Sequence, residues 1–308
     1  MTSHPFASVR SQSATTNLIR LAAWPFLLTS SAAILALGFH VAHAVNFFNL
    51  PYTWIVVIFF NLSYAWIVLW LFLLERRYPY RAEWRDNDGQ IAADLGHTLL
   101  NKGLVQFTIV QLMGLAFFQN RAPAVLSHQP LAVQVLFGLV ASEFGLYWAH
   151  RLSHEWPLLW RFHAVHHSVR RLWLVNTGRF HFVDSNISVV ASLPFLLLPG
   201  ISMDAIVWVS AITAYLGILT HCNVATRCGP LNYVFNTPNL HRWHHSTVIA
   251  EGNANYGQNI MLWDHLFGTF FYRPDSELKE IGIAERMPRG FVAQLYVPFI
   301  WKRYQARV

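Results

Sequence analysis

Cysteine and charge are both scarce in this chain. Only Cys222 and Cys228 occur among its 308 residues, at a spacing that matches none of the usual zinc-binding patterns. We therefore expect two small buried thiols and no disulfide framework. Charged residues make up 12% of the chain, against 54% hydrophobic and 15% aromatic residues. This composition excludes an ordinary soluble protein and favours an integral membrane protein.

Motifs for redox cofactors are also missing. The sequence contains no glycine-rich dinucleotide-binding motif and no recognisable haem or iron–sulfur module. Any electrons that the protein uses must therefore come from a separate partner protein. The formal net charge is +7, but the basic residues lie beside apolar segments and do not form one continuous face. We expect anionic lipid, and not nucleic acid, to contact them.

Long apolar runs dominate the chain. The runs at 21–41 and 51–74 each reach the roughly 20 residues that a bilayer-spanning helix requires. The runs form three hairpins: 21–41 with 51–74, 103–118 with 131–149, and 187–198 with 203–220. The run at 187–198 is too short to cross a bilayer untilted. We predict an all-α integral membrane bundle of about four spanning helices and a further apolar hairpin.

Arginine residues indicate the orientation of the first hairpin. Arg10 and Arg20 precede its first run, four arginines follow its second run between 76 and 85, and the connection at 42–50 has none. By the positive-inside rule, both ends of this hairpin face the cytoplasm. The short cytoplasmic ends favour the inner membrane of a bacterium, or the endoplasmic reticulum if the chain is eukaryotic.

Histidine is abundant where cysteine is not. Three clusters, HRLSH, HAVHH and HRWHH, place histidines three or four residues apart, on one face of a helix. Pro157 is expected to separate the first two helices, and Thr237 with Pro238 to begin the third. The hairpin that ends at 220 returns one more histidine to the clusters. The candidate metal ligands are His150, His154, His163, His166, His167, His221, His241, His244 and His245.

These imidazoles need partners, because a buried polar group without a hydrogen bond or a metal is costly. They exceed the about four ligands of one zinc site, so they indicate two ions in a cap at the cytoplasmic membrane face. Nitrogen donors suit iron, zinc or copper. Attack on an unactivated lipid C–H bond requires activated dioxygen, which two irons provide and zinc does not. We therefore expect two iron ions and dioxygen, with zinc as an alternative occupant after purification.

Other polar residues are candidates for holding the ligands in place. Glu143 lies in the apolar run before His150, and Asp264 follows the third cluster. Each is expected to accept a hydrogen bond from a ligating histidine. The whole set is Glu143, Arg179, His181, Asp184, Asn223, Asn255 and Asp264.

The motifs closely resemble those of the fatty acid hydroxylase and sterol desaturase superfamily. The similarity covers residues 131–272, with YW before the first cluster, LWRFH at the second, and NYG and WDHLFGT after the third. It implies a membrane-bound, non-haem di-metal oxygenase that hydroxylates or desaturates lipids, with the clustered histidines and His221 as metal ligands. Glu143 stands where the family often has Asp. Phe182 and Asp184 replace the proline and glutamate of an R-x-H-P-x-E element, which keeps Arg179 and His181.

The predicted function is hydroxylation or desaturation of a lipid or sterol-like substrate, with electrons from a donor protein that docks on the basic cytoplasmic face. A zinc-dependent membrane hydrolase is an alternative, and it would remain active without oxygen. A metal or haem carrier is another, and it would place polar residues throughout the spans. We divide the chain into an N-terminal membrane hairpin with a cytoplasmic linker (1–90), a catalytic domain (91–275) and a C-terminal interfacial tail (276–308).

Overall fold

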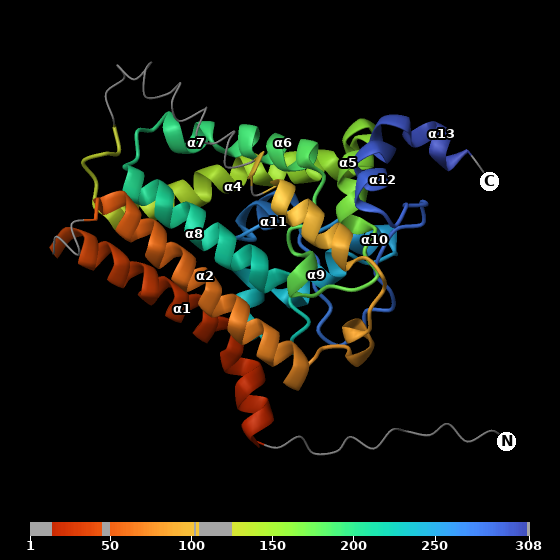
Figure 1. Ribbon diagram of the computed structural model, residues 1–308, viewed down its shortest axis with the longest axis horizontal. Helices are drawn as coiled ribbons and strands as arrows, with labels where there is room; N and C mark the ends of the chain where they lie inside the picture. The colour runs from red at the N-terminus through yellow and green to blue at the C-terminus, as the bar shows by residue number, and fades with distance from the viewer. Residues whose placement is uncertain (1–13, 45–49, 102, 105–124, 307–308) are drawn as a thin grey trace.

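Helices make up the regular structure of the protein. The computed structural model describes residues 14–44, 50–101, 103–104 and 125–306 (Figure 1). Within those ranges, extended pairing is limited to three isolated β-bridges. The predicted all-α fold is confirmed. The part of the expected apolar run that extends from 105 to 118 lies outside the described residues.

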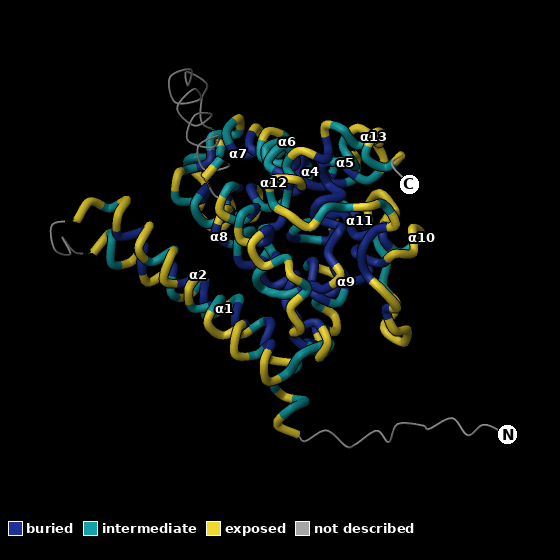
Figure 2. The backbone as a smooth tube through the Cα atoms, turned by 45° about the vertical axis from the view of Figure 1, so that its right-hand side comes forward, coloured by how far each residue is buried: buried dark blue, intermediate teal, exposed yellow. Residues whose placement is uncertain are grey.

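The two N-terminal helices form an antiparallel pair along one side of the molecule (Figures 1 and 2). α1 extends over Ala14–Ala44 and α2 over Tyr52–Arg77. Their inner residues, including Trp24 and Ile67, pack in one cluster with residues of α8 (Met203–Thr220). Outward residues such as Leu62 are apolar and exposed. A helix that is apolar on its exposed face suits a lipid environment.

α4 and α5 carry the first two histidine clusters. α4 (Leu131–Glu155) ends at the residue before Trp156, and α5 (Pro157–His167) begins with the proline in its first turn. The expected break is confirmed, because the ring of Pro157 disfavours a helical conformation at the residue before it. The break allows α5 to turn back, so that its histidines contact those of α4.

The third apolar hairpin is asymmetric. Its first arm is α6 (Phe182–Ser192) followed by α7 (Pro194–Leu197), which together are shorter than a span. Its second arm, α8, is capped by the Ser202 hydroxyl, which accepts a hydrogen bond from the Ala205 amide. Among the described residues, α1, α2, α4 and α8 are long and apolar enough to cross a membrane. One of the four spans is therefore α8 of the further hairpin.

The remaining elements are short and surround the histidines. Residues 91–101 are helical, and α9 (Pro238–His244) carries the third cluster. Thr237 occupies the N-cap position of α9, but its hydroxyl donates to Asn232 at 2.5 Å and does not cap the helix as expected. The others are η2 (Ala82–Arg85), η3 (Leu174–Asn176), η4 (Gly229–Tyr233), α10 (Ile249–Gly252), α11 (Leu262–Phe267), α12 (Phe291–Tyr296), η5 (Val297–Ile300) and α13 (Trp301–Gln305). These lie mainly at one end of the long helices (Figure 1).

Candidate metal centre

The nine histidines predicted as ligands gather in two groups. The five-histidine group consists of His150, His154, His163, His167 and His244. The four-histidine group consists of His166, His221, His241 and His245. Within each group, one ring nitrogen from every member lies within 4.8 Å of all the others. Each group therefore has the ligand supply of one metal site.

The four-histidine group is compact. The Nε2 atom of His241 lies 2.9 Å from that of His221 and 3.1 Å from that of His245. The Nε2 atom of His166 lies 3.1 Å from that of His245 and 3.4 Å from that of His221. Nitrogens bound at about 2.1 Å to one ion lie roughly 3.0 to 3.4 Å apart. These nitrogens thus have the spacing of ligands that share one ion.

The five-histidine group is more open. The Nε2 atoms of His150 and His163 lie 3.1 Å apart. The Nε2 atoms of His154, His167 and His244 are buried and have no hydrogen-bond partner. Buried nitrogens without partners are costly in a protein interior. A metal ion bound by these lone pairs would remove that cost, so the residues fit the expected ions.

Carbonyl and carboxylate oxygens set the tautomers of several rings. The Nδ1 atoms of His150 and His244 lie 2.7 Å from the carbonyl oxygens of Tyr256 and Ala254. The Nδ1 atom of His163 lies 2.9 Å from a carboxylate oxygen of Asp184. A carbonyl or carboxylate oxygen only accepts, so each Nδ1 donates its proton and Nε2 keeps its lone pair. The rings are held in the form that binds metal.

Burial keeps several of the clustered histidines neutral. It lowers the pKa of His221 to about 4 and, with the neighbouring histidines, lowers the pKa of His166 and His245 well below 6.5. Neutral imidazole is the metal-binding form, so no protons need to leave these rings near neutral pH. Burial alone would raise the pKa of the Asp184 carboxyl, but the electrostatic interaction and hydrogen bond with His163 lower it below its usual range. Asp184 is therefore an anion beside the site.

Glu143 and Asp264 do not contact the histidines as expected. Glu143 accepts hydrogen bonds from the Gln258 amide and from both the amide and the side chain of Asn259. Asp264 accepts from the amides of Tyr256 and Gly257, at 2.8 and 2.7 Å, and from the Thr269 hydroxyl. Both carboxylates therefore fix the loop after α10, whose Tyr256 carbonyl in turn holds His150.

The other predicted polar residues hold the backbone around the site. The Arg179 side chain is buried and pairs with Asp94 at 2.8 Å, while its carbonyl accepts from His166 Nδ1 at 3.2 Å. His181 caps α6 by accepting from the Val183 amide. Two asparagines brace loops. Asn223 bonds with both the amide and the carbonyl of Arg81, and Asn255 does the same with Phe271.

Some residues beside the histidines were not among the candidates. Phe180 stacks on His166 with ring centroids 3.9 Å apart, and the Asn253 amide oxygen accepts a hydrogen bond from His154 Nδ1 at 3.1 Å. The carbonyls of Tyr256 and Ala254 were also missed, because carbonyl groups leave no trace in residue type. Phe180 lies between Arg179 and His181 of the R-x-H-P-x-E element, and that position was the one signal available.

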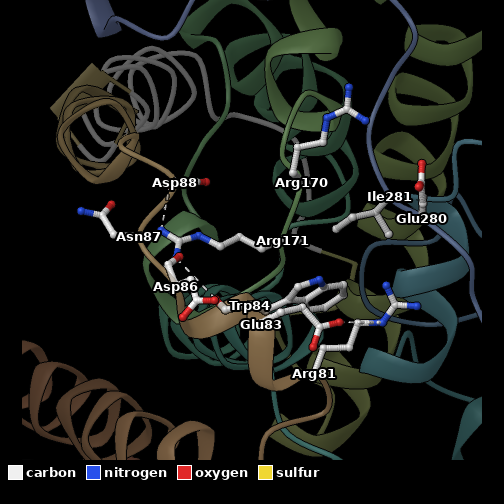
Figure 3. A pocket seen from close by; sticks show the side chains of 10 residues that line it. All are labelled: Arg81, Glu83, Trp84, Asp86, Asn87, Asp88, Arg170, Arg171, Glu280 and Ile281. Carbon is white, nitrogen blue, oxygen red and sulfur yellow. Dashed lines mark hydrogen bonds and ion pairs between the residues drawn. The ribbon is translucent and has the colours of Figure 1, made fainter.

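A polar hollow lies apart from the histidines. It has a volume of about 440 Å³ and is lined by residues of the linker, of the loop after α5 and of the C-terminal segment (Figure 3). Arg171 crosses it and bonds with Asp88 at 2.9 Å and with the Asp86 carbonyl. Glu83 and Glu280 add further negative charge. The hollow carries both signs of charge and is lined by no histidine.

Known proteins resemble this chain in the same region. The fatty acid hydroxylase family model matches residues 135–269, which contain all nine histidines. Ornithine lipid hydroxylase OlsE of Rhizobium tropici is 44% identical over 90% of this chain and 82% of its own. The chain belongs to the fatty acid hydroxylase family.

The Cys222 and Cys228 thiols are free and buried, also as expected.

Other members of the fatty acid hydroxylase family match over shorter stretches. Alkylglycerol monooxygenase of Danio rerio is 32% identical over 53% of this chain and 36% of its own. Delta(7)-sterol 5(6)-desaturase of Eremothecium gossypii is 33% identical over 48% of this chain and 40% of its own. No solved structure matches the chain. The family and the apolar helices confirm the prediction of a membrane oxygenase that acts on a lipid.

Proposed function

We propose that this protein is a di-iron lipid hydroxylase that uses dioxygen and electrons from a separate protein. The observation that carries the proposal is the pair of histidine groups, each with the ligands of one ion. Two bound irons would supply activation of dioxygen for attack on a C–H bond. One oxygen atom of dioxygen would be inserted into the C–H bond to give C–OH, and the other would leave as water, with two electrons from the donor protein and two protons from the solvent.

The side chains around the histidines orient them and exclude water. The Asp184 carboxylate fixes the His163 ring, and Phe180 covers one face of the His166 ring. All but His154 of the nine ligand candidates are buried. A site closed to bulk water suits a reactive oxidant, because water would divert it. In this proposal residues 91–275 form the catalytic domain, between the N-terminal hairpin and linker and the interfacial tail.

Ornithine lipid is the first substrate to test, because the relative that matches most of the chain is named for it. We further propose that the histidine cap faces the cytoplasm, where the donor protein docks. Anionic lipid would contact the arginines that follow α2. Docking through charge would weaken as salt concentration rises.

Metal content tests the proposal directly. The wild-type protein, purified in mild detergent, is expected to carry about two irons per chain by mass spectrometry, in line with two separate ligand sets. A His163→Ala/His244→Ala variant should lose the iron of the five-histidine group. His128 is exposed and belongs to neither histidine group, so His128→Ala is a matched control. This variant should keep both irons.

Oxygen dependence separates the proposal from the alternative hydrolase. Hydroxylation of the lipid by the iron-loaded protein should stop without oxygen and resume when oxygen is returned. Two zinc ions with full lipid turnover in anaerobic buffer would instead make the protein a hydrolase. If the purified protein binds neither iron nor zinc, the histidine groups are not metal sites.

A further inference from the structure

Two cavities meet beside the histidines. The inner cavity has a volume of about 120 Å³ and is lined by members of both histidine groups, among them His163 and His241. The outer cavity has a volume of about 360 Å³ and lies among α4, α6, α7 and α8. Both are lined by the same three residues, Phe180, Ser188 and Gln258. These three residues therefore lie between the two cavities, and we refer to this place as the passage.

Three helices each lead from the outer cavity to the histidines. On α8, Ser210, Thr213 and Gly217 follow one another at helical spacing and end at His221. Residues three or four apart share one face of a helix, so this face lines a continuous path. Ser142 and Leu146 lead to His150 on α4 in the same way, and α6 contributes Ser192, Ser188 and Asp184.

Gly217 keeps the inner end of this path open. A Cβ atom at Gly217 would meet no atom within 4 Å. The glycines of α4 differ, because a Cβ at Gly138 would lie 2.8 Å from Val209 and one at Gly145 would lie 2.1 Å from the Ala191 carbonyl oxygen. Close packing explains those two glycines and does not explain Gly217. A glycine inside a helix costs up to about 1 kcal/mol relative to alanine, and here it leaves free space beside His221.

The inner cavity is small. A dry cavity of about 150 Å³ holds one benzene molecule, so about 120 Å³ admits a fragment of only a few carbon atoms. A short stretch of a linear chain fits this volume, whereas a fused ring system exceeds it. Phe180, which stacks on His166, lies where the two cavities adjoin. The outer cavity, lined by Leu193, Leu196, Ile206 and Val209, matches the rest of an apolar chain.

We propose that the outer cavity binds an unbranched alkyl or acyl chain of a membrane lipid. Phe180, Ser188 and Gln258 pass a short stretch of that chain to the histidines, and Gly217 provides the space for it. The chain enters between α6 and α8, which both pack on α4. α4 and α8 are candidate spans, so a lipid can reach the cavity from within the membrane. Gly217 and Phe180 determine specificity, and they exclude sterol rings. This proposal rests on the proposed oxidation at the histidines.

Photo-crosslinking tests the binding path without requiring turnover. The full-length protein in lipid nanodiscs is exposed to a phosphatidylcholine with a diazirine in the middle of one acyl chain, and in parallel to a diazirine-bearing cholesterol. Labelled peptides are mapped by mass spectrometry. We expect the acyl probe to label α6 and α8 at cavity residues such as Ser192 and Thr213, and Phe180 at the passage. The sterol probe should label only outward faces.

Two variants sharpen the test. Gly217→Leu fills the space beside His221 and should reduce acyl labelling of Phe180 several-fold, while labelling of Ser192 remains. Val190→Leu adds bulk on α6 at a residue that is 56% exposed and lines neither cavity. It should change neither the labelling of Phe180 nor that of Ser192. Acyl labelling confined to α1 and α2, or unchanged in Gly217→Leu, would overturn the proposal, as would sterol labelling at the passage.

Metal content, measured on the same samples, separates the two proposals. Acyl labelling at the passage of a protein that binds no iron would support the chain-binding path and reject the di-iron function. Two irons without labelling at the passage would support the di-iron function and reject the chain-binding path. The melting temperature of Gly217→Leu, compared with Val190→Leu, shows whether a loss of labelling reflects a filled cavity or a misfolded protein.

Discussion

The two histidine groups are held differently, although both lie in one cap. In the four-histidine group the Nε2 atoms are 2.9 to 3.4 Å apart, and the Nδ1 atoms of His166 and His221 face backbone carbonyls. In the five-histidine group His163 bonds with the Asp184 carboxylate, and three Nε2 atoms have no partner. Among the described residues, Asp184 is the carboxylate that bonds with a ligand candidate. A divalent ion is attracted to this anion, so we expect the five-histidine group to bind its ion more tightly.

Removal of a ligand should have the largest effect. His241 contacts two other histidines of its group, so His241→Ala leaves three nitrogens and an unfilled space where four nitrogens stood. We expect iron to fall from about two ions per chain to about one, and hydroxylation to fall by more than the roughly 10- to 100-fold typical of outer partners. Mass spectrometry and product analysis measure both. Full iron in this variant, beside an unchanged His128→Ala control, would show that the four-histidine group is not a metal site.

The charge of Asp184 should have the next largest effect. Asp184→Asn keeps an oxygen that accepts from His163 Nδ1 but removes the negative charge. Loss of such an outer partner lowers metal affinity by about 10- to 100-fold, and here only in the five-histidine group. Titration with a chelator, followed by metal analysis, should show one weakened ion and one unchanged ion. Asp275 is exposed and gives the control Asp275→Asn. Equal weakening of both ions would contradict the distinction between the groups.

Much of this arrangement follows from sequence alone. The break at Pro157 and the return of His221 depend on local chemistry and helical spacing, and both were expected. The roles of Glu143 and Asp264 were not expected. Glu143 bonds to backbone amides of a loop far away in sequence, and Asp264 bonds to amides of the same loop, to which it is close in sequence. A sequence states that a carboxylate is buried, but long-range folding decides which donor faces it.

The division into two groups could not be predicted either. Helical spacing places His163, His166 and His167 on one helix, yet His166 belongs to one group and the other two to the other. The division depends on how α5 sits between α4 and α9, which is a matter of tertiary packing. The same packing creates the two cavities, and α4, α6 and α8 contribute lining residues to both.

The contact between α4 and α6 should support the five-histidine group selectively. A Cβ at Gly145 would lie 2.1 Å from the Ala191 carbonyl oxygen, so Gly145→Ala must push α6 away from α4. Overpacking of this kind costs about 1 to 3 kcal/mol, and it would also shift Asp184 relative to His163. We expect a lower melting temperature in detergent and a weaker ion in the five-histidine group. Gly103→Ala, where a Cβ would meet no atom within 4 Å, is the control. A variant as stable as wild type would show that the helices separate without cost.

Acid should destabilise the metal-free protein through the four-histidine group in a smaller, graded way. Burial lowers the pKa of His221 from 6.5 to about 4, so the unfolded chain takes up a proton below about pH 6.5 that the folded chain refuses until about pH 4. Folding stability falls with falling pH wherever the unfolded state binds more protons than the folded state. The melting temperature should therefore decline as pH falls from 6.5 to 4 and stay level just above 6.5. His221→Asn removes this titration and should give a shallower decline. Asp184, whose pKa is lowered by His163, stays ionised in this window and cannot account for the difference. Identical pH profiles for His221→Asn and wild type would show that His221 is not buried in neutral form. That result would also contradict the description of the four-histidine group as neutral nitrogen donors.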